Sequence, residues 1–216
     1  ELAAHCAARN IQFSCTPFYL EAVAELLPFV AYYKIASYEL MWDALLETCC
    51  KTGKPVVLST GMAELPEIVH AVEVMRAAGG RDLTLLHTVS AYPTPPAEAN
   101  LASIDLIRRM TGLPVGWSDH TVNPGVIHRA VSRWGAGFIE FHLDLDASGA
   151  EYAAGHCWLP EQIAPVIAQV RAGERADGEG FKSASPSELP DRDWRADPAD
   201  GLRPLRHIRD EWKKAS

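Results

Sequence analysis

The sequence lacks several features that would place it at once in a broad class of protein. It has no run of about 18 apolar residues, which a transmembrane helix would need, and no charged-then-apolar signal segment at its start. Basic residues are the minority, because 20 Lys and Arg face 28 Asp and Glu, a net charge of −8. Nucleic-acid binding requires basic patches that neutralise phosphates. We therefore expect a cytoplasmic protein with no nucleic-acid partner and no membrane partner.

A disulfide framework is also missing. The chain has five cysteines, an odd number, with no CxxC pair, and Cys49 and Cys50 are adjacent. A small secreted domain would have an even and more regular set. The pattern favours reduced, mostly buried thiols.

What the sequence does contain is an alternation of short apolar runs with amphipathic helical stretches. The runs have the four to six residues typical of strands and are nearly continuous, as strands buried on both faces are. Six are predicted, at residues 11–14, 31–35, 55–58, 83–87, 114–117 and 137–141. Helical periodicity is clearest at residues 21–27, 65–78 and 123–134. Strand–helix alternation predicts parallel strands joined by helical crossovers.

Two architectures fit this alternation, an open doubly wound sheet and a closed (β/α)₈ barrel. No G-x-G-x-x-G follows any strand, and polar residues end all six strands, as in TIM-type barrels. We favour an α/β fold in which residues 1–172 form a partial TIM-barrel catalytic domain with about six of eight β/α units. Because the chain starts at Glu1, without Met and within a predicted helix, we expect the other two units upstream. Residues 173–216 are predicted to be an irregular extension on the domain surface, with a short helix near 205–214.

Two histidines end neighbouring predicted strands. Adjacent strands lie about 4.8 Å apart, so His120 and His142 could share one divalent ion, with Glu39 supplying a carboxylate directly or through water. Mixed imidazole and carboxylate ligands suit Mn²⁺, Fe²⁺, Co²⁺ or Zn²⁺, and also admit Mg²⁺. The alternative is that each histidine is an ordinary core or loop residue. Lys34, inside an apolar strand, could hold a phosphate or carboxylate, form a Schiff base, or extend to solvent at an edge.

Hydroxyl side chains recur where strands end. They suit the oxygens of a phosphate, although each alone could instead be a helix cap or turn residue; they are Thr16, Ser37, Ser59, Thr60, Ser90 and Ser118. His156, predicted in the loop after the last strand, could reach the same site. The neighbouring Cys157 has no evident base and orienting partner, so a nucleophilic role is not predicted. The remaining histidines are interpreted as structural (His87, His128) or solvated (His5, His70, His207).

An ordered set of motifs resembles a known family. These motifs are Phe13-Ser14-Cys15-Thr16-Pro17-Phe18, Tyr33-Lys34-Ile35-Ala36-Ser37-Tyr38-Glu39, Thr52 to Met62, Leu85-Leu86-His87, Tyr92-Pro93-Thr94-Pro95, Gly116-Trp117-Ser118-Asp119-His120-Thr121 and Ile139-Glu140-Phe141-His142. Together they resemble the catalytic barrel of the sialic acid synthase (N-acetylneuraminate synthase) family over about residues 8–172. The resemblance implies a transferase that condenses phosphoenolpyruvate with N-acetylmannosamine or a related amino sugar. The products would be a nonulosonic acid and phosphate.

The resemblance also assigns roles to residues. His120 and His142 match the metal ligands, with Glu39 close to the ion, and Tyr92 matches a residue near the acceptor sugar. The positions around phosphoenolpyruvate are matched by Thr16, Lys34, Ser59, Ser90 and Ser118. The implied cofactor is a divalent metal, Mn²⁺ or Mg²⁺, with Co²⁺ as a further candidate. Lys34 would then be an electrostatic clamp rather than a Schiff-base former, and Lys34, Glu39, His120 and His142 form the predicted catalytic set.

Three departures from the family pattern leave alternatives open. The two earliest β/α units are not in this sequence, so we expect the segment alone to be inactive. Glu151 or His156 would have to replace the acidic residue of a Gly-Pro-Asp segment, which leaves the acceptor sugar open. Residues 173–216 do not resemble the antifreeze-like domain that covers the partner's site in family dimers, although a homodimer is still expected. A synthase for another acceptor and a non-catalytic barrel fragment are the alternatives.

Overall fold

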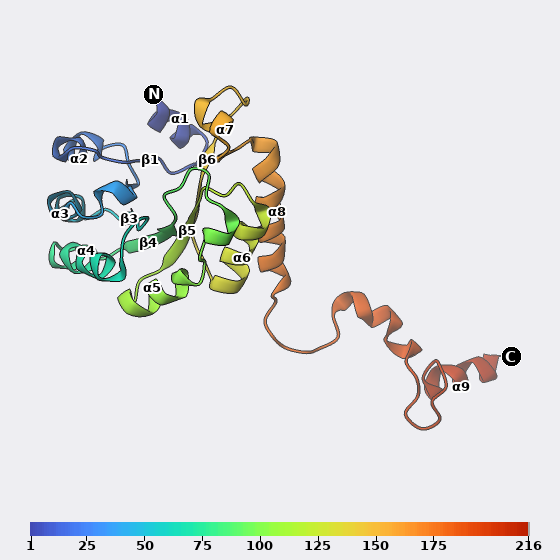
Figure 1. Cartoon of the computed structure of the whole chain (residues 1–216). Coiled ribbons are helices and arrows are strands. Elements are labelled where there is room, and N and C mark those ends of the chain that lie inside the picture. The colour runs from blue at the N-terminus through green and yellow to red at the C-terminus, as the bar shows by residue number, and fades with distance from the viewer. Residues whose placement is uncertain (216) are drawn as a thin grey trace. The chain divides into compact units, whose positions relative to one another are not determined.

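The computed structural model describes residues 1–215 and divides into two compact units, Glu1–Ala172 and a second unit from Gly173 onward. The first unit is an α/β structure in which helices surround one parallel sheet (Figure 1). Among residues 1–215, no helix combines the length and the apolar character that a membrane crossing requires.

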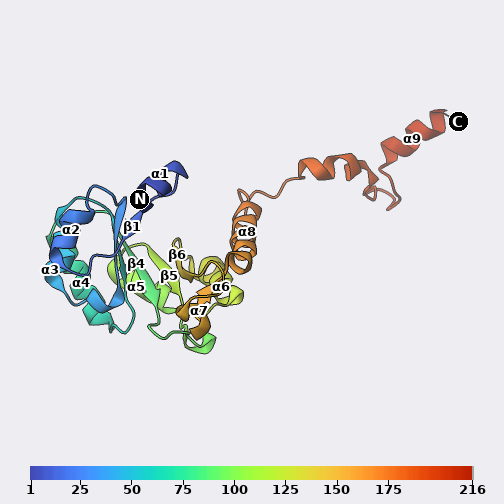
Figure 2. The ribbon, with the colours of Figure 1, turned by 90° about the horizontal axis from the view of Figure 1, so that it is seen from above.

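The sheet contains seven parallel strands whose spatial order follows their order in the chain. They are β1 (Ser14–Cys15), β2 (Tyr32–Ile35), β3 (Val56–Ser59), β4 (Leu83–Thr88), β5 (Val115–Asp119), β6 (Ile139–Leu143) and β7 (Cys157–Trp158). An order that never reverses is that of a barrel wall and not of a doubly wound sheet, whose order changes direction at a switch point. Within residues 1–215, β1 and β7 each pair with a single neighbour, so the sheet is a curled half-barrel (Figure 2).

The strand count corrects the sequence-based prediction of six. The missed strand, β7, has only two residues, Cys157 and Trp158, which is too short to stand out as an apolar run. It pairs in parallel with β6, and Asp144 N donates to Trp158 O at 2.9 Å. His156 therefore lies immediately before the last strand, and not in a loop after it.

The helices follow the strands as the alternation predicts. Their bounds are α1 (Leu2–Ala8), α2 (Leu20–Leu26), α3 (Asp43–Lys51), α4 (Leu65–Ala77), α5 (Ser103–Thr111), α6 (Pro124–Trp134), α7 (Ala150–Ala154), α8 (Pro160–Ala176) and α9 (Arg206–Ala215), with short 3₁₀ helices at Ser37–Glu39, Pro96–Glu98 and Pro186–Trp194. The ends of α6 show why the sequence specifies them. Asn123 Oδ1 accepts from Gly125 N at 2.9 Å, Pro124 occupies the first turn, and Gly135 ends the helix at φ 66°.

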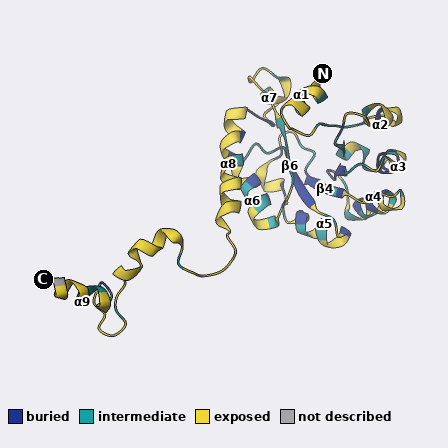
Figure 3. Cartoon of the chain, turned by 180° about the vertical axis from the view of Figure 1, so that it is seen from behind, coloured by how far each residue is buried: buried dark blue, intermediate teal, exposed yellow. Residues whose placement is uncertain are grey.

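Strand alternation separates an apolar side of the sheet from a polar one. On β2, Tyr33 and Ile35 are fully buried against the helices, so Lys34 between them points to the opposite, inner face. The same alternation on β5 buries Trp117 and directs Ser118 to the inner face. Burial is concentrated along the strands and the inward sides of the helices (Figure 3). The core thus forms between sheet and helices, and the inner face is left for polar side chains.

Candidate active site

A cavity of about 360 Å³ opens at the carboxyl ends of the strands, on the inner face of the sheet. Its lining comes from β1 to β6 or the segments that follow them; the lining residues are Thr16, Lys34, Ala36, Ser37, Tyr38, Ser59, Thr88, Tyr92, Ser118, His120, Glu140, Phe141 and His142. The structure therefore brings seven of the sequence-predicted site residues into one cavity: Thr16, Lys34, Ser59, Tyr92, Ser118, His120 and His142.

Lys34 is paired across the cavity. Its Nζ lies 3.3 Å from Glu140 Oε1, and Ser118 Oγ donates to the same oxygen at 2.8 Å. Ser118 and Glu140 are register partners on β5 and β6, which fixes this contact in the sheet. A lysine that is largely removed from solvent needs an anionic partner, and Glu140 supplies one to Lys34. Sequence reasoning missed Glu140, although a carboxylate inside an apolar strand is the same signal that pointed to Lys34.

Hydroxyl groups cluster beside Lys34. Ser37 Oγ accepts from Gly61 N at 2.9 Å, and a Cβ at Gly61 would collide with the hydroxyls of Ser37 and Ser90. Glycine is therefore required where these serines approach the backbone. Ser59 Oγ is buried without a hydrogen-bond partner among the described residues, as an oxygen that awaits a polar ligand would be.

The imidazoles of His120 and His142 lie together, with ring centroids 5.2 Å apart. Tyr92 packs on both, at 4.2 Å from the ring of His120 and 5.8 Å from that of His142. His120 Nδ1 lies 2.8 Å from Val89 O, which assigns a proton to Nδ1 and leaves Nε2 with its lone pair. Burial lowers the pKa of His120 below its usual value, so the neutral, metal-binding form is favoured.

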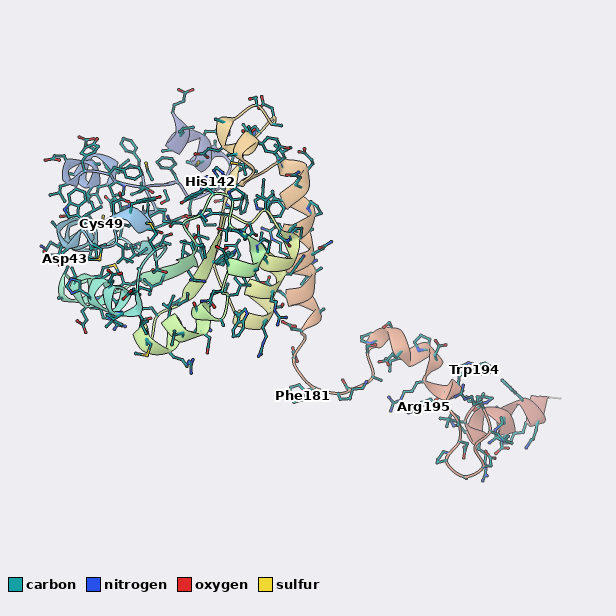
Figure 4. All side chains as sticks on the ribbon, in the orientation of Figure 1. Asp43, Cys49, His142, Phe181, Trp194 and Arg195 are labelled. Carbon is teal, nitrogen blue, oxygen red and sulfur yellow. The ribbon has the colours of Figure 1, made fainter. Side chains whose placement is uncertain are left out.

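A second group of polar side chains extends from His142 on β6 to Cys157, the first residue of β7. Glu151, on α7, places Oε2 at 3.1 Å from His142 Nδ1 and 3.8 Å from His156 Nε2. Cys157 Sγ lies 3.8 Å from the same carboxylate oxygen. Burial, followed by the charges of Glu151 and Asp144, raises the pKa of the Cys157 thiol, so a free thiolate is disfavoured. Figure 4 shows His142 at the end of the sheet near α7.

Glu39 and Ser90 are not among the residues that line the cavity, although Ser90 adjoins it through Gly61. Burial raises the pKa of Glu39, and the charge of nearby Lys34 partly opposes this. Glu39 Oε2 is buried and lacks a hydrogen-bond partner within residues 1–215. Outside the site, His87 Nε2 lies 2.9 Å from Ala99 O and His70 lies beside Asp43.

A half-barrel with its polar residues gathered at the carboxyl ends of parallel strands defines the class of TIM-type barrel proteins. Comparison with known proteins narrows this class. The model of the NeuB family matches residues 1–182, and the chain belongs to that family.

Several relatives are named as nonulosonic acid synthases. The chain is 37% identical over 193 residues to N,N'-diacetyllegionaminic acid synthase of Campylobacter jejuni, which covers 87% of this chain and 57% of the relative. It is 40% identical over 192 residues to the uncharacterized protein MJ1065 of Methanocaldococcus jannaschii, covering 87% and 56%. The chain thus spans just over half the length of these relatives.

A solved structure confirms the fold. The N-acetylneuraminic acid (sialic acid) synthetase of Leptospira borgpetersenii, in complex with citrate, aligns with a TM-score of 0.77 at 30% identity and covers 88% of this chain and 66% of that one. The predicted resemblance to the sialic acid synthase family is confirmed, and the α/β barrel-type fold is confirmed as a seven-stranded half-barrel.

Proposed function

We propose that this chain carries the catalytic barrel of an enzyme that condenses phosphoenolpyruvate with an amino-sugar aldehyde, giving a nonulosonic acid and phosphate. The observation that carries the proposal is the content of one cavity. Lys34 and serine hydroxyls line it together with the imidazoles of His120 and His142. A phosphorylated anion and a carbonyl compound require these two kinds of group in the same place.

The Lys34 side suits the phosphate and carboxylate of phosphoenolpyruvate. The ammonium group offers positive charge in a site from which water is partly excluded, and Ser37 and Ser59 offer hydroxyls that can donate to phosphate oxygens, whereas the Ser118 hydroxyl donates to Glu140. Glu140 is paired with Lys34, and the incoming anion would compete with this carboxylate for the ammonium group.

The histidine side suits the acceptor aldehyde. The residues fit a divalent ion because His120 keeps Nε2 unprotonated and His142 lies beside it. We propose that His142 binds the ion, with His120 and Glu39 as the partners that the sequence predicts. A bound divalent ion would supply Lewis-acid polarisation of the aldehyde oxygen. Tyr92, stacked on His120, would cover the acceptor.

The remaining chemistry falls to groups of the chain. The enol carbon of phosphoenolpyruvate forms the new C–C bond to the aldehyde carbon, and the aldehyde oxygen gains a proton. Water then adds to the former enol carbon, and phosphate leaves with its bridging oxygen. Glu39, a buried carboxyl near Lys34 with an uncommitted oxygen, is suited to orient that water and accept its proton.

Two observations add a second candidate acceptor to N-acetylmannosamine. The relative from Campylobacter jejuni is named for a product with two acetyl groups, and the segment 149–156 lacks the family's Gly-Pro-Asp. A diacetamido sugar is therefore the second candidate acceptor, with Glu151 and His156 near its polar groups. A homodimer and a cytoplasmic location stay predictions.

The test begins with ligand binding to the full chain. Calorimetry should detect phosphoenolpyruvate binding, and Lys34→Met should weaken it by about 100-fold, because a charge-assisted contact is lost in a partly buried site. Lys51→Met is the matched control, since Lys51 is exposed on α3 and pairs only with Glu47 there. Absence of binding, or equal binding by Lys34→Met, contradicts the proposal.

Turnover measurements distinguish between the candidate acceptor sugars. Phosphate release from phosphoenolpyruvate is measured with Mn²⁺ and a panel of N-acetylmannosamine, diacetamido sugars and simple aldoses. Release that depends on both an amino-sugar acceptor and the ion supports the proposed reaction, and His142→Ala should abolish it. Binding of phosphoenolpyruvate without release from any acceptor favours the non-catalytic alternative.

A further inference from the structure

Another cavity, of about 340 Å³, lies where helices α4 and α5 meet the helix-facing side of β4. The two helices are neighbours around the sheet (Figure 1). They supply the apolar walls of the cavity, which are Leu65 and Ile68 on α4 and Leu106 and Ile107 on α5. His87 joins Leu85 on this side of β4, because alternate residues of a strand share a face. We call this space the helix-side cavity, and its volume is within the range of sites that hold small ligands.

The helix-side cavity differs from the active-site cavity in its charge. The active-site cavity contains Lys34 and Glu140. Among the described residues, those that line the helix-side cavity include no Asp, Glu, Lys or Arg. A charged ligand would lose its hydration there without gaining a partner of opposite charge. The cavity therefore suits an uncharged molecule.

His87 gives the helix-side cavity a hydrogen-bond acceptor. Its side chain is buried, and its Nε2 lies 2.9 Å from Ala99 O. This contact assigns the ring proton to Nε2 and leaves Nδ1 with a lone pair. Burial lowers the pKa of His87, so the neutral ring is favoured. A ligand that pairs with Nδ1 has to bring a donor.

The threonines of the cavity have also committed their protons. Thr60 Oγ1 donates to Leu86 O at 3.0 Å. Thr88 Oγ1 donates to Ser118 O at 2.8 Å. Each hydroxyl therefore keeps only its lone pairs for a ligand. Together with His87, they present acceptors to a molecule that carries hydroxyl or N–H groups.

The segment that joins β3 to α4 separates the two cavities. Ser59 lines the active-site cavity, whereas Thr60 and Met62 line the helix-side cavity. Met62 has a φ of 64°, and Asn100, which also lines the helix-side cavity, has a φ of 41°. Left-handed conformations are uncommon for residues other than glycine and are concentrated at functional sites. Two of them on one cavity indicate walls that are shaped for an occupant.

We propose that the helix-side cavity binds a compact, uncharged molecule with an apolar body and a hydroxyl or N–H donor that pairs with His87 Nδ1. The apolar body packs between α4 and α5, where it covers the aliphatic side chains of the walls. No residue to which the proposed condensation gives a role is needed for this binding. The two proposals can therefore fail separately.

Phenol and toluene are the probes, because they share a ring and differ by one hydroxyl donor. Binding to the full chain is followed through the methyl NMR signals of its four methionines. The Met62 signal should shift with phenol in a saturable way, whereas the signal of Met41, which is exposed and lies outside the cavity lining, should not. Phenol should bind about fivefold more tightly than toluene, which is the effect of one hydrogen bond. Benzoate and benzylammonium should bind more weakly than phenol, because the cavity has no partner for their charges.

Two tryptophan variants on α5 test the location. Leu106→Trp should fill the helix-side cavity and weaken phenol binding by about 10-fold or more. Met110→Trp, one turn further along α5 and outside the cavity lining, is the matched control and should bind phenol as the unaltered chain does. Both side chains are partly exposed, at 41% and 54%, so either position can accept a larger side chain without disturbing the core.

The variant His87→Phe tests the acceptor. It keeps a buried ring without Nδ1, so phenol and toluene should bind to it with affinities that agree within about twofold. Equal affinities for the two probes in the unaltered chain would overturn the assignment of a donor-bearing ligand. The site itself would be overturned by the absence of a Met62 shift, or by phenol binding that Leu106→Trp leaves unchanged.

Discussion

The two halves of the sheet, β1 to β4 and β5 to β7, differ in the chemistry of their side chains. Around β1 to β4, the core contains aliphatic side chains and the thiols of Cys49 and Cys50, and the cavity face carries Lys34 and hydroxyls. Around β5 to β7, the core encloses a carboxylate, Asp119, and the cavity face carries imidazoles. Figure 4 shows Cys49 on the outer helix α3 and His142 at the end of the sheet. The first half thus presents a cation and hydroxyls to the cavity, and the second presents imidazoles held by a buried polar network.

Asp119 is the buried hydrogen-bond acceptor that connects the strands of the second half. It is fully buried, accepts from Trp117 Nε1 at 3.1 Å and Trp158 Nε1 at 3.0 Å, and also accepts from Thr121 Oγ1 at 2.7 Å. Trp158 is on β7, so one carboxylate connects β5 to the edge strand. This network holds β7, and with it Cys157, against the sheet.

The largest expected effect follows from removing that carboxylate. Asp119→Ala leaves two buried indole N–H groups without acceptors, at a cost of about 1–3 kcal/mol each. The free energy of unfolding, measured in urea, should fall by about 3 kcal/mol or more. Asp119→Asn keeps an oxygen acceptor, so its free energy of unfolding should fall by clearly less. Equal losses in the two variants would show that the hydrogen bonds do not hold the second half together.

The two adjacent buried thiols of the first half, Cys49 and Cys50, predict a pH effect on stability, and the second half has one buried thiol, Cys157. Burial raises the pKa of Cys49 from 9.0 to about 12, so the folded state keeps its proton when the unfolded chain has lost it. A raised folded pKa gives stability that is complete below pH 9 and is lost as the pH rises toward 12. Between pH 8 and 10, Cys49 should account for a fall of about 1.4 kcal/mol in the free energy of unfolding.

Urea titrations at several pH values check this, with the slope as the readout. Cys49→Ala should flatten the dependence above pH 9, whereas Cys6→Ala on α1 should leave the slope as it is. An unchanged slope in Cys49→Ala would mean that the buried thiol does not resist ionisation.

The sequence predicted the strands from residue 31 to 87 better than the two outermost strands, since the predicted run at 11–14 shares only Ser14 with β1 and β7 was not predicted. Lys34 and the strands from residue 31 to 87 were recognised because each strand is a continuous apolar run. Strand β7 was missed because two residues carry no periodicity, and its place depends on hydrogen bonds to β6 and the Trp158–Asp119 contact. Those contacts are long-range and leave no local pattern.

Prediction of the site from the sequence was limited in the same way, by contacts between residues that are distant in the chain. The sequence identified His120, His142 and Lys34 as inner-face residues at strand ends, and the cavity contains them. It did not identify Glu140 as the partner of Lys34, because pairing across a barrel depends on curvature. It also placed His156 after the last strand, so the convergence of His156 and Cys157 on His142 was not foreseen.

The ion pair between Lys34 on β2 and Glu140 on β6 joins the two halves. Its removal is expected to have a smaller effect than the two changes above. Glu140→Gln removes a negative charge about 3–4 Å from the position where an anion would meet Lys34, and such a charge opposes the anion by about 1 kcal/mol in a solvated site. Phosphoenolpyruvate should therefore bind about fivefold more tightly to Glu140→Gln, as measured by calorimetry. Glu161→Gln, at an exposed position in the first turn of α8, is the control and should bind as the unaltered chain does. Weaker binding in Glu140→Gln would indicate that the carboxylate mainly holds Lys34 in place.

The smallest effect is expected for an ion pair on the surface of the first half. Asp43 on α3 lies 3.0 Å from His70 Nε2 on α4, but the side chains are 46% and 56% exposed. Water screens such pairs, and their contribution is about 0.2–1 kcal/mol. Asp43→Ala should therefore lower the free energy of unfolding by about 0.5 kcal/mol in urea, several times less than Asp119→Ala. Both variants remove an aspartate that contacts an aromatic nitrogen donor, so the ratio of their effects measures burial and not residue type. Comparable losses would show that the helices of the first half depend on their surface contacts as strongly as the second half depends on Asp119.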